Sequence, residues 1–286
     1  MPGPQQLRRT VPGLPAPGRC LVIGVLNVTP DSFSDGGRFI DPEAALAHGL
    51  ALVAAGADVV DVGGESTRPG AGRVDATEER RRIEPVVRGL AAAGVIVAVD
   101  TTRAAVAEAA LAAGAALVND VSAGSADPDM LRVVAAARVP YVLMHSRGPS
   151  SDMAERAQYA DVVGEVATEL RERRDAAVAA GIEPECIVLD PGLGFAKRPE
   201  HNWTLLRALP ALHALGHPLV IGGSRKAFLG ALLATEAGPR PTAAREAATT
   251  ALSALSAAGG VWAVRVHEPR ASRDAVEVAA AWTADE

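Results

Sequence analysis

Short apolar runs recur along the chain, and nearly all of them end on polar or ionisable side chains of kinds that bind ligands. These ends carry Asn27, Asp100, Asn119, His145, Asp190, Ser224, Lys226, Arg265 and His267. Polar groups at the depth of a protein core cost free energy unless they are paired. Mutually satisfied structural residues could account for single members, such as Glu65 or Asp120. A whole ring of polar ends instead favours a ligand pocket.

The hydrogen-bond acceptors of this ring follow the middle runs. Asp100, Asn119 and Asp190 carry carboxylate or amide oxygens. Such a set suits a planar heterocycle that presents amino and ring N–H groups. We therefore expect these three residues to bind the ring of a ligand.

The cations follow the last runs, at Lys226, Arg265 and His267, and return in one earlier loop at Arg68. Arg265 and His267 are two residues apart, so within one strand both side chains point the same way. Cations with this spacing suit phosphate or pyrophosphate. The pattern predicts an anion at one side of the pocket.

Asn27 ends the first run, in NVTPDSFSDGG. An amide oxygen can ligate Mg²⁺, which keeps several waters and bridges phosphate oxygens, although an asparagine at a strand end commonly caps a turn. The segments 28–40 and 65–76 are long and rich in Gly, Ser and Asp, which is typical of mobile lids. Asp35 and Arg68 could pair across these loops when they close, or could simply be solvated.

The spacing of the apolar runs predicts a fold that places all their ends at one face. The runs cover residues 21–27, 58–64, 95–101, 116–122, 141–145, 187–192, 218–223 and 261–267. Each is apolar on both faces, as in parallel strands covered by helices. Helical stretches alternate with them, beginning at Asp41-Pro42-Glu43, Thr77, Arg103 and Val162. We predict an α/β fold, a single-domain (β/α)₈ TIM barrel over residues 20–286, whose strand ends form the active site.

An open doubly wound sheet is the rival fold, but no Gly-x-Gly-x-x-Gly follows the first run. Residues 1–19 are rich in Pro and Gly and are predicted to form a disordered arm. They lack the apolar core of a secretory signal.

Composition excludes several classes of partner and site. The net charge of −6 gives no reason to expect nucleic acid or an anionic membrane. No stretch reaches the ~20 apolar residues of a membrane span. Cys20 and Cys186 are far apart and lack metal-ligand spacing, which favours two free thiols and a cytoplasmic protein.

Several longer motifs resemble those of the dihydropteroate synthase family. They are GVLNVTPDSFSDGG (24–37), DVGGESTRPGA (61–71), VDT (99–101), VNDVSAG (118–124), LMH (143–145), LDPGLGFAK (189–197), GGSRKAFLG (222–230) and VRVH (264–267). The resemblance spans about residues 20 to 282. It implies condensation of 6-hydroxymethyl-7,8-dihydropterin pyrophosphate with p-aminobenzoate to give 7,8-dihydropteroate, with Mg²⁺ as cofactor and a homodimeric enzyme.

The resemblance also implies a role for each site residue. The pterin would contact Asp100, Asn119, Val121, Met144, Asp190, Phe195 and Lys226. Pyrophosphate would lie on Asn27, Arg68, Arg265 and His267, with Mg²⁺ at Asn27. p-Aminobenzoate would contact Phe33, Thr67, Pro69 and Ser224, and the catalytic residues would be Asp35, Arg68 and Lys226.

Two other functions compete with this interpretation. A pterin-dependent methyltransferase shares the barrel but has no need of a pyrophosphate clamp. A non-catalytic pterin-binding paralogue should have lost Asn27, Asp35, Arg68 or Lys226, and all four are present. Phe33 and Pro69 are of the family's usual types, so we expect sensitivity to sulfonamides. Ala227 and the loop 146–153 depart from the family pattern, and they leave open the affinity for p-aminobenzoate and for sulfonamides.

Overall fold

Strands and helices alternate through the computed structural model, which describes residues 10–29, 41–65, 74–148 and 155–284. The strands are β1 (Leu21–Asn27), β2 (Val59–Gly63), β3 (Val97–Asp100), β4 (Leu117–Asp120), β5 (Tyr141–Met144), β6 (Ile187–Asp190), β7 (Val220–Ile221) and β8 (Ala263–Val266). The α-helices are α2 (Pro42–Ala54), α3 (Ala76–Ala92), α4 (Ala104–Ala112), α5 (Met130–Ala137), α6 (Val162–Ala179), α7 (Pro199–Arg207), α8 (Leu209–His213), α9 (Ala227–Leu232), α10 (Glu246–Ala258) and α11 (Pro269–Trp282). Two short 3₁₀ helices are η1 (Pro184–Cys186) and η2 (Thr242–Ala244).

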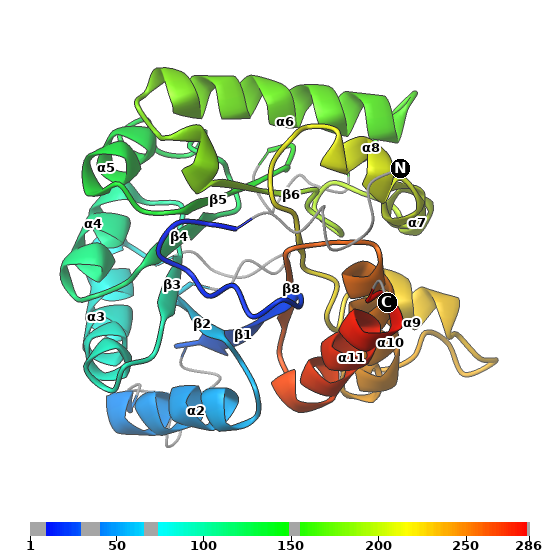
Figure 1. Ribbon diagram of the computed structural model, residues 1–286, viewed down its shortest axis with the longest axis horizontal. Coiled ribbons are helices and arrows are strands. Elements are labelled where there is room, and N and C mark those ends of the chain that lie inside the picture. Colours follow the sequence, from blue (N-terminus) through cyan, green and yellow to red (C-terminus); the bar gives the residue numbers. More distant parts are fainter. Residues whose placement is uncertain (1–9, 30–40, 66–73, 149–154, 285–286) are drawn as a thin grey trace.

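The strands form one parallel sheet in the order β6-β5-β4-β3-β2-β1-β8-β7. A bridge between Leu189 and Leu219 joins β6 to the segment that leads into β7, so the sheet curls into a barrel. Helices surround the strands (Figure 1). The predicted single-domain (β/α)₈ barrel is confirmed, and each predicted run contains one strand.

Aspartates mark the starts of the first two helices. The Asp41 carboxylate accepts a hydrogen bond from the Glu43 backbone N–H at 2.9 Å, with Pro42 in the first turn of α2. The Asp75 carboxylate accepts from the Glu78 N–H at 2.8 Å. Helix α3 therefore begins slightly before the predicted start at Thr77, because Asp75 supplies the cap.

The barrel interior changes from apolar to polar along the strands. Side chains alternate between the two faces of a strand, so every second residue points inward. One inward layer is apolar and buried and includes Val59, Ala98, Leu117, Val142 and Val188. The inward positions two residues later hold Asp61, Asp100, Asn119, Met144 and Asp190. The apolar layer closes the barrel, and the polar layer lies at the carboxyl ends of the strands.

The segment before β1 covers the opposite end of the barrel. Val11 is buried and packs with the interior apolar layer. Arg19 is also buried and pairs with Asp58 at 2.8 Å and with Glu277 of α11 at 2.7 Å. The prediction of a disordered arm is therefore wrong for residues 10–19, because Val11 and Arg19 have specific partners. Residues 1–9 lie outside the described part of the chain.

None of the helices in the described ranges is long and apolar enough to cross a membrane.

Candidate active site

Arg265 of β8 joins two carboxylates inside the carboxyl end of the barrel. Its Nε atom lies 2.6 Å from Asp61 Oδ2, and its Nη2 atom lies 2.7 Å from Asp100 Oδ2. Asn119 Nδ2 donates a third hydrogen bond to Asp61 Oδ2 at 2.9 Å. Because its amide NH₂ is used here, Asn119 presents its oxygen as an acceptor. β2, β3, β4 and β8 thus contribute to one polar cluster.

This cluster contains hydrogen-bonding capacity that its own members leave unused. Within the described residues, Asp61 Oδ1 and Asp100 Oδ1 are buried and have no hydrogen-bond partner. Burial raises the pKa of Asp100 to about 7, an effect that the nearby Arg265 charge opposes and the Asp61 charge reinforces. Buried oxygens of this kind are costly unless a ligand or water donates to them. The cluster is therefore suited to a ligand with several N–H groups.

Sequence reasoning missed Asp61. The residue lies within a predicted apolar run, DVVDVGG, rather than at its end. An acidic residue inside such a run is itself a signal, because a charge placed in a strand buried on both faces needs partners.

A tight turn after β6 shapes the next part of the site. Asp190 Oδ1 accepts a hydrogen bond from the Gly192 N–H at 2.7 Å. Burial raises the pKa of Asp190, and the positive charge of Lys226 opposes the shift. Gly192 has a φ of +67°, and a Cβ there would lie 1.9 Å from the His145 carbonyl oxygen. Only glycine fits where the turn approaches β5 this closely.

Lys226 lies across from this turn, just before α9. Its ammonium donates to the Leu193 carbonyl and lies 4.6 Å from the centre of the Phe195 ring. Burial lowers the pKa of Lys226 to about 8, and the Asp190 charge opposes that shift. Lys226 thus lies close to Asp190, which was predicted from the end of another run, and to Phe195, which the family resemblance implied.

Arg225, the residue before Lys226, makes ion pairs elsewhere. Arg225 has a φ of +61° and pairs with Glu246, and with Glu268 at 3.0 Å. The two adjacent cations therefore have different surroundings, and of the two only Lys226 contacts the segment after β6.

Ser224 and His267 connect the ends of β7 and β8. Ser224 Oγ accepts from the His267 backbone N–H at 3.2 Å and lies 3.0 Å from His267 Nδ1. Because Nδ1 lies against the Ser224 hydroxyl, the Nε2 atom of His267 is on the other side of the ring. Asn27 ends β1 and is in register with Gly63 of β2, beside this cluster of strand ends.

The apolar residues predicted to pack against a ring, Val121, Met144 and Phe195, lie at or just after the ends of β4, β5 and β6. Met144 is buried at the end of β5 and in register with Asp190. Val121 and Phe195 are partly exposed, and the Val121 carbonyl accepts from Ser146 Oγ at 2.8 Å.

Two acidic residues that could have been ligands serve the scaffold instead. Asp120 accepts hydrogen bonds from the Tyr141 hydroxyl at 2.8 Å and from the Ser122 hydroxyl at 2.7 Å. Glu65 pairs with Arg103 at 2.8 Å and accepts from the Val74 N–H at 3.2 Å. The structural interpretation fits both residues.

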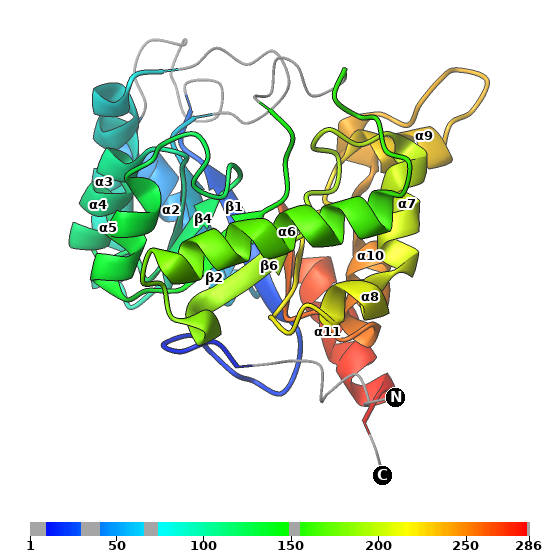
Figure 2. The ribbon, with the colours of Figure 1, turned by 90° about the horizontal axis from the view of Figure 1, so that it is seen from above.

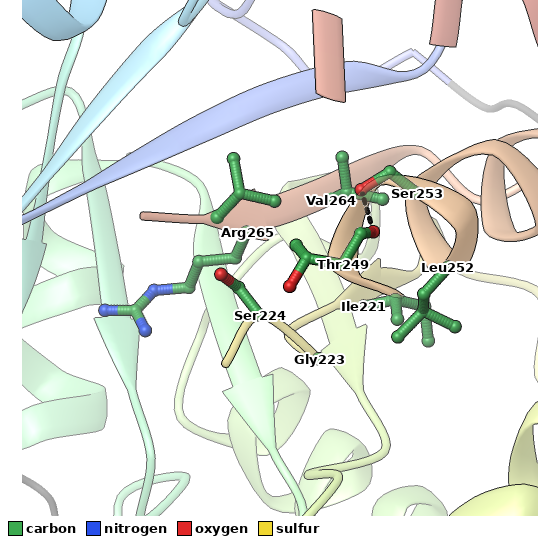
Figure 3. Close-up of a pocket in the computed structure, with 9 residues that line it drawn as sticks. Ile221, Gly223, Ser224, Thr249, Leu252, Ser253, Val264 and Arg265 are labelled. Atoms are coloured by element: carbon green, nitrogen blue, oxygen red, sulfur yellow. Dashed lines mark hydrogen bonds between the residues drawn. The ribbon is translucent and has the colours of Figure 1, made fainter. Parts of the chain in front are cut away.

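A small cavity lies behind Ser224 and Arg265, between β7, β8 and α10 (Figure 3). The Ser253 hydroxyl on its wall donates to the Thr249 carbonyl at 3.0 Å. The Arg265 guanidinium extends away from it, as Figure 3 shows. The cavity has room for about one water molecule, so it is a packing feature and not the substrate site.

Five predicted site residues lie outside the described residues. They are Phe33, Asp35, Thr67, Arg68 and Pro69. Their predicted roles stay predictions.

The metal prediction can be compared with the available donors. Over the described ranges there is no cluster of three or more His, Cys, Asp or Glu side chains that could hold a metal ion. Asn27 offers one hard oxygen at the strand ends. A single protein ligand combined with phosphate oxygens and waters is a usual arrangement for Mg²⁺, so Asn27 fits that ion when a pyrophosphate is also bound.

Comparison with known proteins connects this geometry to one family. Residues 23–267 match the family described as pterin binding enzyme. The chain is 59% identical over 263 residues to the dihydropteroate synthase of Mycobacterium leprae, a match that covers 91% of this chain and 93% of the relative.

Solved structures agree in fold. Xanthomonas albilineans dihydropteroate synthase with 4-aminobenzoic acid superposes with a TM-score of 0.87 at 44% identity, covering 97% of this chain and 100% of that one. The Yersinia pestis dihydropteroate synthase in complex with a sulfonamide drug gives 0.87 at 38% identity, covering 96% and 98%.

Proposed function

The chain belongs to the dihydropteroate synthase family of pterin binding enzymes, and we propose that it condenses 6-hydroxymethyl-7,8-dihydropterin pyrophosphate with p-aminobenzoate. The products are 7,8-dihydropteroate and pyrophosphate. The observation that carries the proposal is a pair of buried oxygens, Asp61 Oδ1 and Asp100 Oδ1, that have no hydrogen-bond partner among the described residues and lie beside the acceptors of Asn119 and Asp190. A pterin ring supplies amino and ring N–H donors that complement these acceptors.

The pyrophosphate would lie toward β1 and β8. Arg265 has its guanidinium at the inner edge of this region, and His267 presents its Nε2 side there because Nδ1 lies against Ser224. Asn27 would hold Mg²⁺, and a bound Mg²⁺ neutralises negative charge on a departing pyrophosphate. Arg68 would add a further cation from the loop after β2.

The reaction requires positioning and charge stabilisation. The C–O bond between the pterin methylene and the pyrophosphate breaks, the arylamine nitrogen bonds to that carbon, and the nitrogen loses a proton. Positive charge that develops on the pterin would be stabilised by the carboxylates of Asp100 and Asp190. Lys226 would donate a hydrogen bond to the pterin and hold it against the Phe195 ring.

p-Aminobenzoate would enter from the loops at the carboxyl ends of the strands. Ser224 lies at that edge, and Phe33, Thr67 and Pro69 would complete the p-aminobenzoate site. Pairing of Asp35 with Arg68 after the pterin binds would give ordered addition of the two substrates.

We also propose that two copies of the chain associate. Helices α10 and α11 lie side by side (Figure 2), and they expose Leu255 at 70%, Val278 at 65% and Trp282 at 85%. Large exposed apolar side chains on neighbouring helices favour a protein interface. Light scattering of the purified chain should give twice the monomer mass, and Trp282→Glu should reduce it to the monomer mass.

The place of action is proposed to be the cytoplasm. Cys20 and Cys186 are both buried free thiols in the structure. Free thiols are typical of proteins in a reducing compartment. Detection of the native protein by cell fractionation tests this assignment.

Pyrophosphate release tests the function. The assay contains the dihydropterin pyrophosphate, Mg²⁺ and p-aminobenzoate, with each omitted in turn. We expect release to depend on all three and to collapse in Lys226→Ala and Asp190→Ala, while Arg81→Ala on the exposed side of α3 keeps full activity. Pterin binding without turnover dependent on p-aminobenzoate would instead identify a non-catalytic paralogue, and methyl transfer to or from a pterin would identify a methyltransferase.

A further inference from the structure

Lysine is almost absent from this chain. Of its 28 Lys and Arg residues, only Lys197 and Lys226 are lysines. Both ammonium groups contact the segment that follows β6. Everywhere else the chain uses arginine as its cation, so the compact ammonium is found only where it touches this segment. An ammonium directs three donors to close acceptors, whereas a guanidinium is a planar fork.

Lys197 is buried and belongs to a chain of side chains that leads to helix α6. Its Nζ atom lies 2.8 Å from His145 Nδ1 and donates to the Phe195 carbonyl at 3.0 Å. The fully buried His145 has its Nε2 atom 3.0 Å from Glu169 Oε2. Burial lowers the pKa of His145 to about 4, so the ring is neutral, donates from Nε2 to Glu169 and accepts from Lys197 at Nδ1.

The segment that these groups hold is conformationally demanding. Gly192 and Ala196 both have positive φ, at +67° and +47°. A non-glycine residue in this region, such as Ala196, requires support from its surroundings. Hydrogen bonds to three carbonyls of the segment supply it: Lys226 bonds that of Leu193, Lys197 that of Phe195, and the Tyr159 hydroxyl that of Ala196 at 3.0 Å.

We propose that Lys197, held through His145 by Glu169, is a positioning residue that fixes segment 191–197 in the shape that receives the pterin. It touches neither the ring nor the reacting atoms. It acts through Phe195, whose ring it orients by bonding the Phe195 carbonyl, and through the turn that carries Asp190. The inference rests on the proposed function, because it takes the pterin as the ligand.

The charge of Lys197 strengthens the same arrangement. The groups that face its ammonium are His145 and Arg147 after β5, Asp190 at the end of β6, Lys226 before α9 and Glu169 on α6. Burial lowers the pKa of Lys197 to about 7, with Asp190 and Glu169 opposing the shift and Lys226 and Arg147 adding to it. The positive charge that Lys197 itself places near Asp190 is therefore lost as the pH rises through about 7.

Two acidic residues on α6 provide a matched pair of variants. Glu165 and Glu169 both pair with Arg147, but of the two only Glu169 also bonds His145. Binding of 6-hydroxymethylpterin to the full-length protein is measured by calorimetry at pH 6.5. We expect Lys197→Met to weaken binding by about 10- to 100-fold, as for loss of a buried charged hydrogen bond. Glu169→Ala should weaken binding in the same direction, while Glu165→Ala stays within about twofold of the wild type.

Kinetics and spectroscopy distinguish positioning from general stability. Lys197→Met should raise KM for the pterin substrate more than it lowers kcat, and Lys197→Arg should recover part of the loss. Because the chain has two lysines, protein labelled with ¹⁵N-lysine gives two side-chain signals, and Lys197→Arg assigns them. We expect the Lys197 signal to titrate with a midpoint near pH 7. The midpoint should move to lower pH in Glu169→Ala and stay unchanged in Glu165→Ala.

Several results would overturn the proposal. One is a Lys197→Met variant that melts at a lower temperature but binds the pterin like the wild type. Another is equal weakening by Glu165→Ala and Glu169→Ala, which would assign the effect to Arg147. Failure of the wild-type protein to bind pterin or release pyrophosphate would refute the proposed function itself. The role of Lys197 and the proposed function can therefore be refuted separately.

Discussion

Arg265 and Asp61 are 204 residues apart in the chain and meet inside the barrel, with Nε and Oδ2 2.6 Å apart. The pair joins β8 to β2, and β1 lies between these two strands in the sheet. Because Asp100 binds the same guanidinium, the position of Arg265 depends on two carboxylates. Arg265, which the sequence predicts to bind an anion, thus also holds together the cluster of hydrogen-bonding side chains inside the barrel.

Replacing Asp61 should affect both stability and ligand binding. Asp61→Asn removes one charged partner of Arg265, and we expect a loss of about 2 kcal/mol in the free energy of unfolding. Pterin affinity should fall by at least about tenfold, because Arg265 and Asn119 lose the group that orients them. Calorimetry and urea unfolding measure the two effects.

Asp58 supplies the control for this experiment. It lies three residues earlier, at the opposite end of the barrel, and pairs with Arg19 and Arg273. Asp58→Asn should lower stability and leave pterin affinity unchanged. Equal losses of affinity in both variants would show that affinity follows stability and that Asp61 has no specific role.

Asp100 should make the unliganded protein less stable as the pH rises. Its pKa is raised to about 7 in the folded state, so folding favours its protonated form. The resulting contribution is fully present below about pH 4 and is lost as the pH rises through about 7. The Asp100→Asn variant has no carboxyl group at this position and therefore does not lose this contribution. The free energy of unfolding of the variant minus that of the wild type should rise by about 2 kcal/mol between pH 4 and pH 8. Parallel stability curves for the two proteins would rule this out.

The same substitution should lower activity, because an amide at position 100 removes a negatively charged hydrogen-bond acceptor from the proposed pterin site. Stability gained at the expense of activity is expected where a buried carboxylate is kept for a ligand. Measurement of kcat/KM for Asp100→Asn at pH 8 checks this second half of the prediction.

Gly192 should tolerate no side chain. Gly192→Ala would place a Cβ 1.9 Å from the His145 carbonyl oxygen at a φ of +67°. We expect a loss of more than about 2 kcal/mol in the free energy of unfolding and loss of pterin binding. Gly216 is the matched control, since it has a φ of +85° and no heavy atom of the described residues lies within 4 Å of the position that an added Cβ would take. Gly216→Ala should cost about 1 kcal/mol and leave binding intact; similar results for both variants would contradict the steric argument.

The repeat of apolar runs was sufficient to predict the barrel, because parallel strands buried on both faces leave a clear pattern. The strand ends also predicted where Asp100, Asn119 and Asp190 lie, since all strands of such a barrel finish at one face. What the pattern could not predict was which side chains of different strands pair inside the barrel. Asp61 and Arg265 are distant in sequence, and no local signal indicates that they meet.

The N-terminal segment shows a second limit of sequence reasoning. Its Pro and Gly content resembles that of a disordered arm, yet Val11 covers the barrel interior and Arg19 pairs with Asp58 and Glu277. A single apolar residue and one arginine can order a short segment when tertiary partners are available. Composition alone does not report those partners.

Sulfonamide inhibition follows from the chemistry of the acceptor. A sulfonamide drug carries an arylamine like that of p-aminobenzoate, so it should compete for the site next to Ser224 and bind only after the pterin. When formation of 7,8-dihydropteroate is followed, we expect the apparent KM for p-aminobenzoate to rise linearly with the drug concentration while kcat stays unchanged. Pyrophosphate should also be released when the drug replaces p-aminobenzoate, because its amine can attack the pterin methylene. Normal formation of 7,8-dihydropteroate at drug concentrations that saturate a typical member of the family would exclude this interpretation and would point to Ala227 or the loop 146–153 as the place where this chain differs.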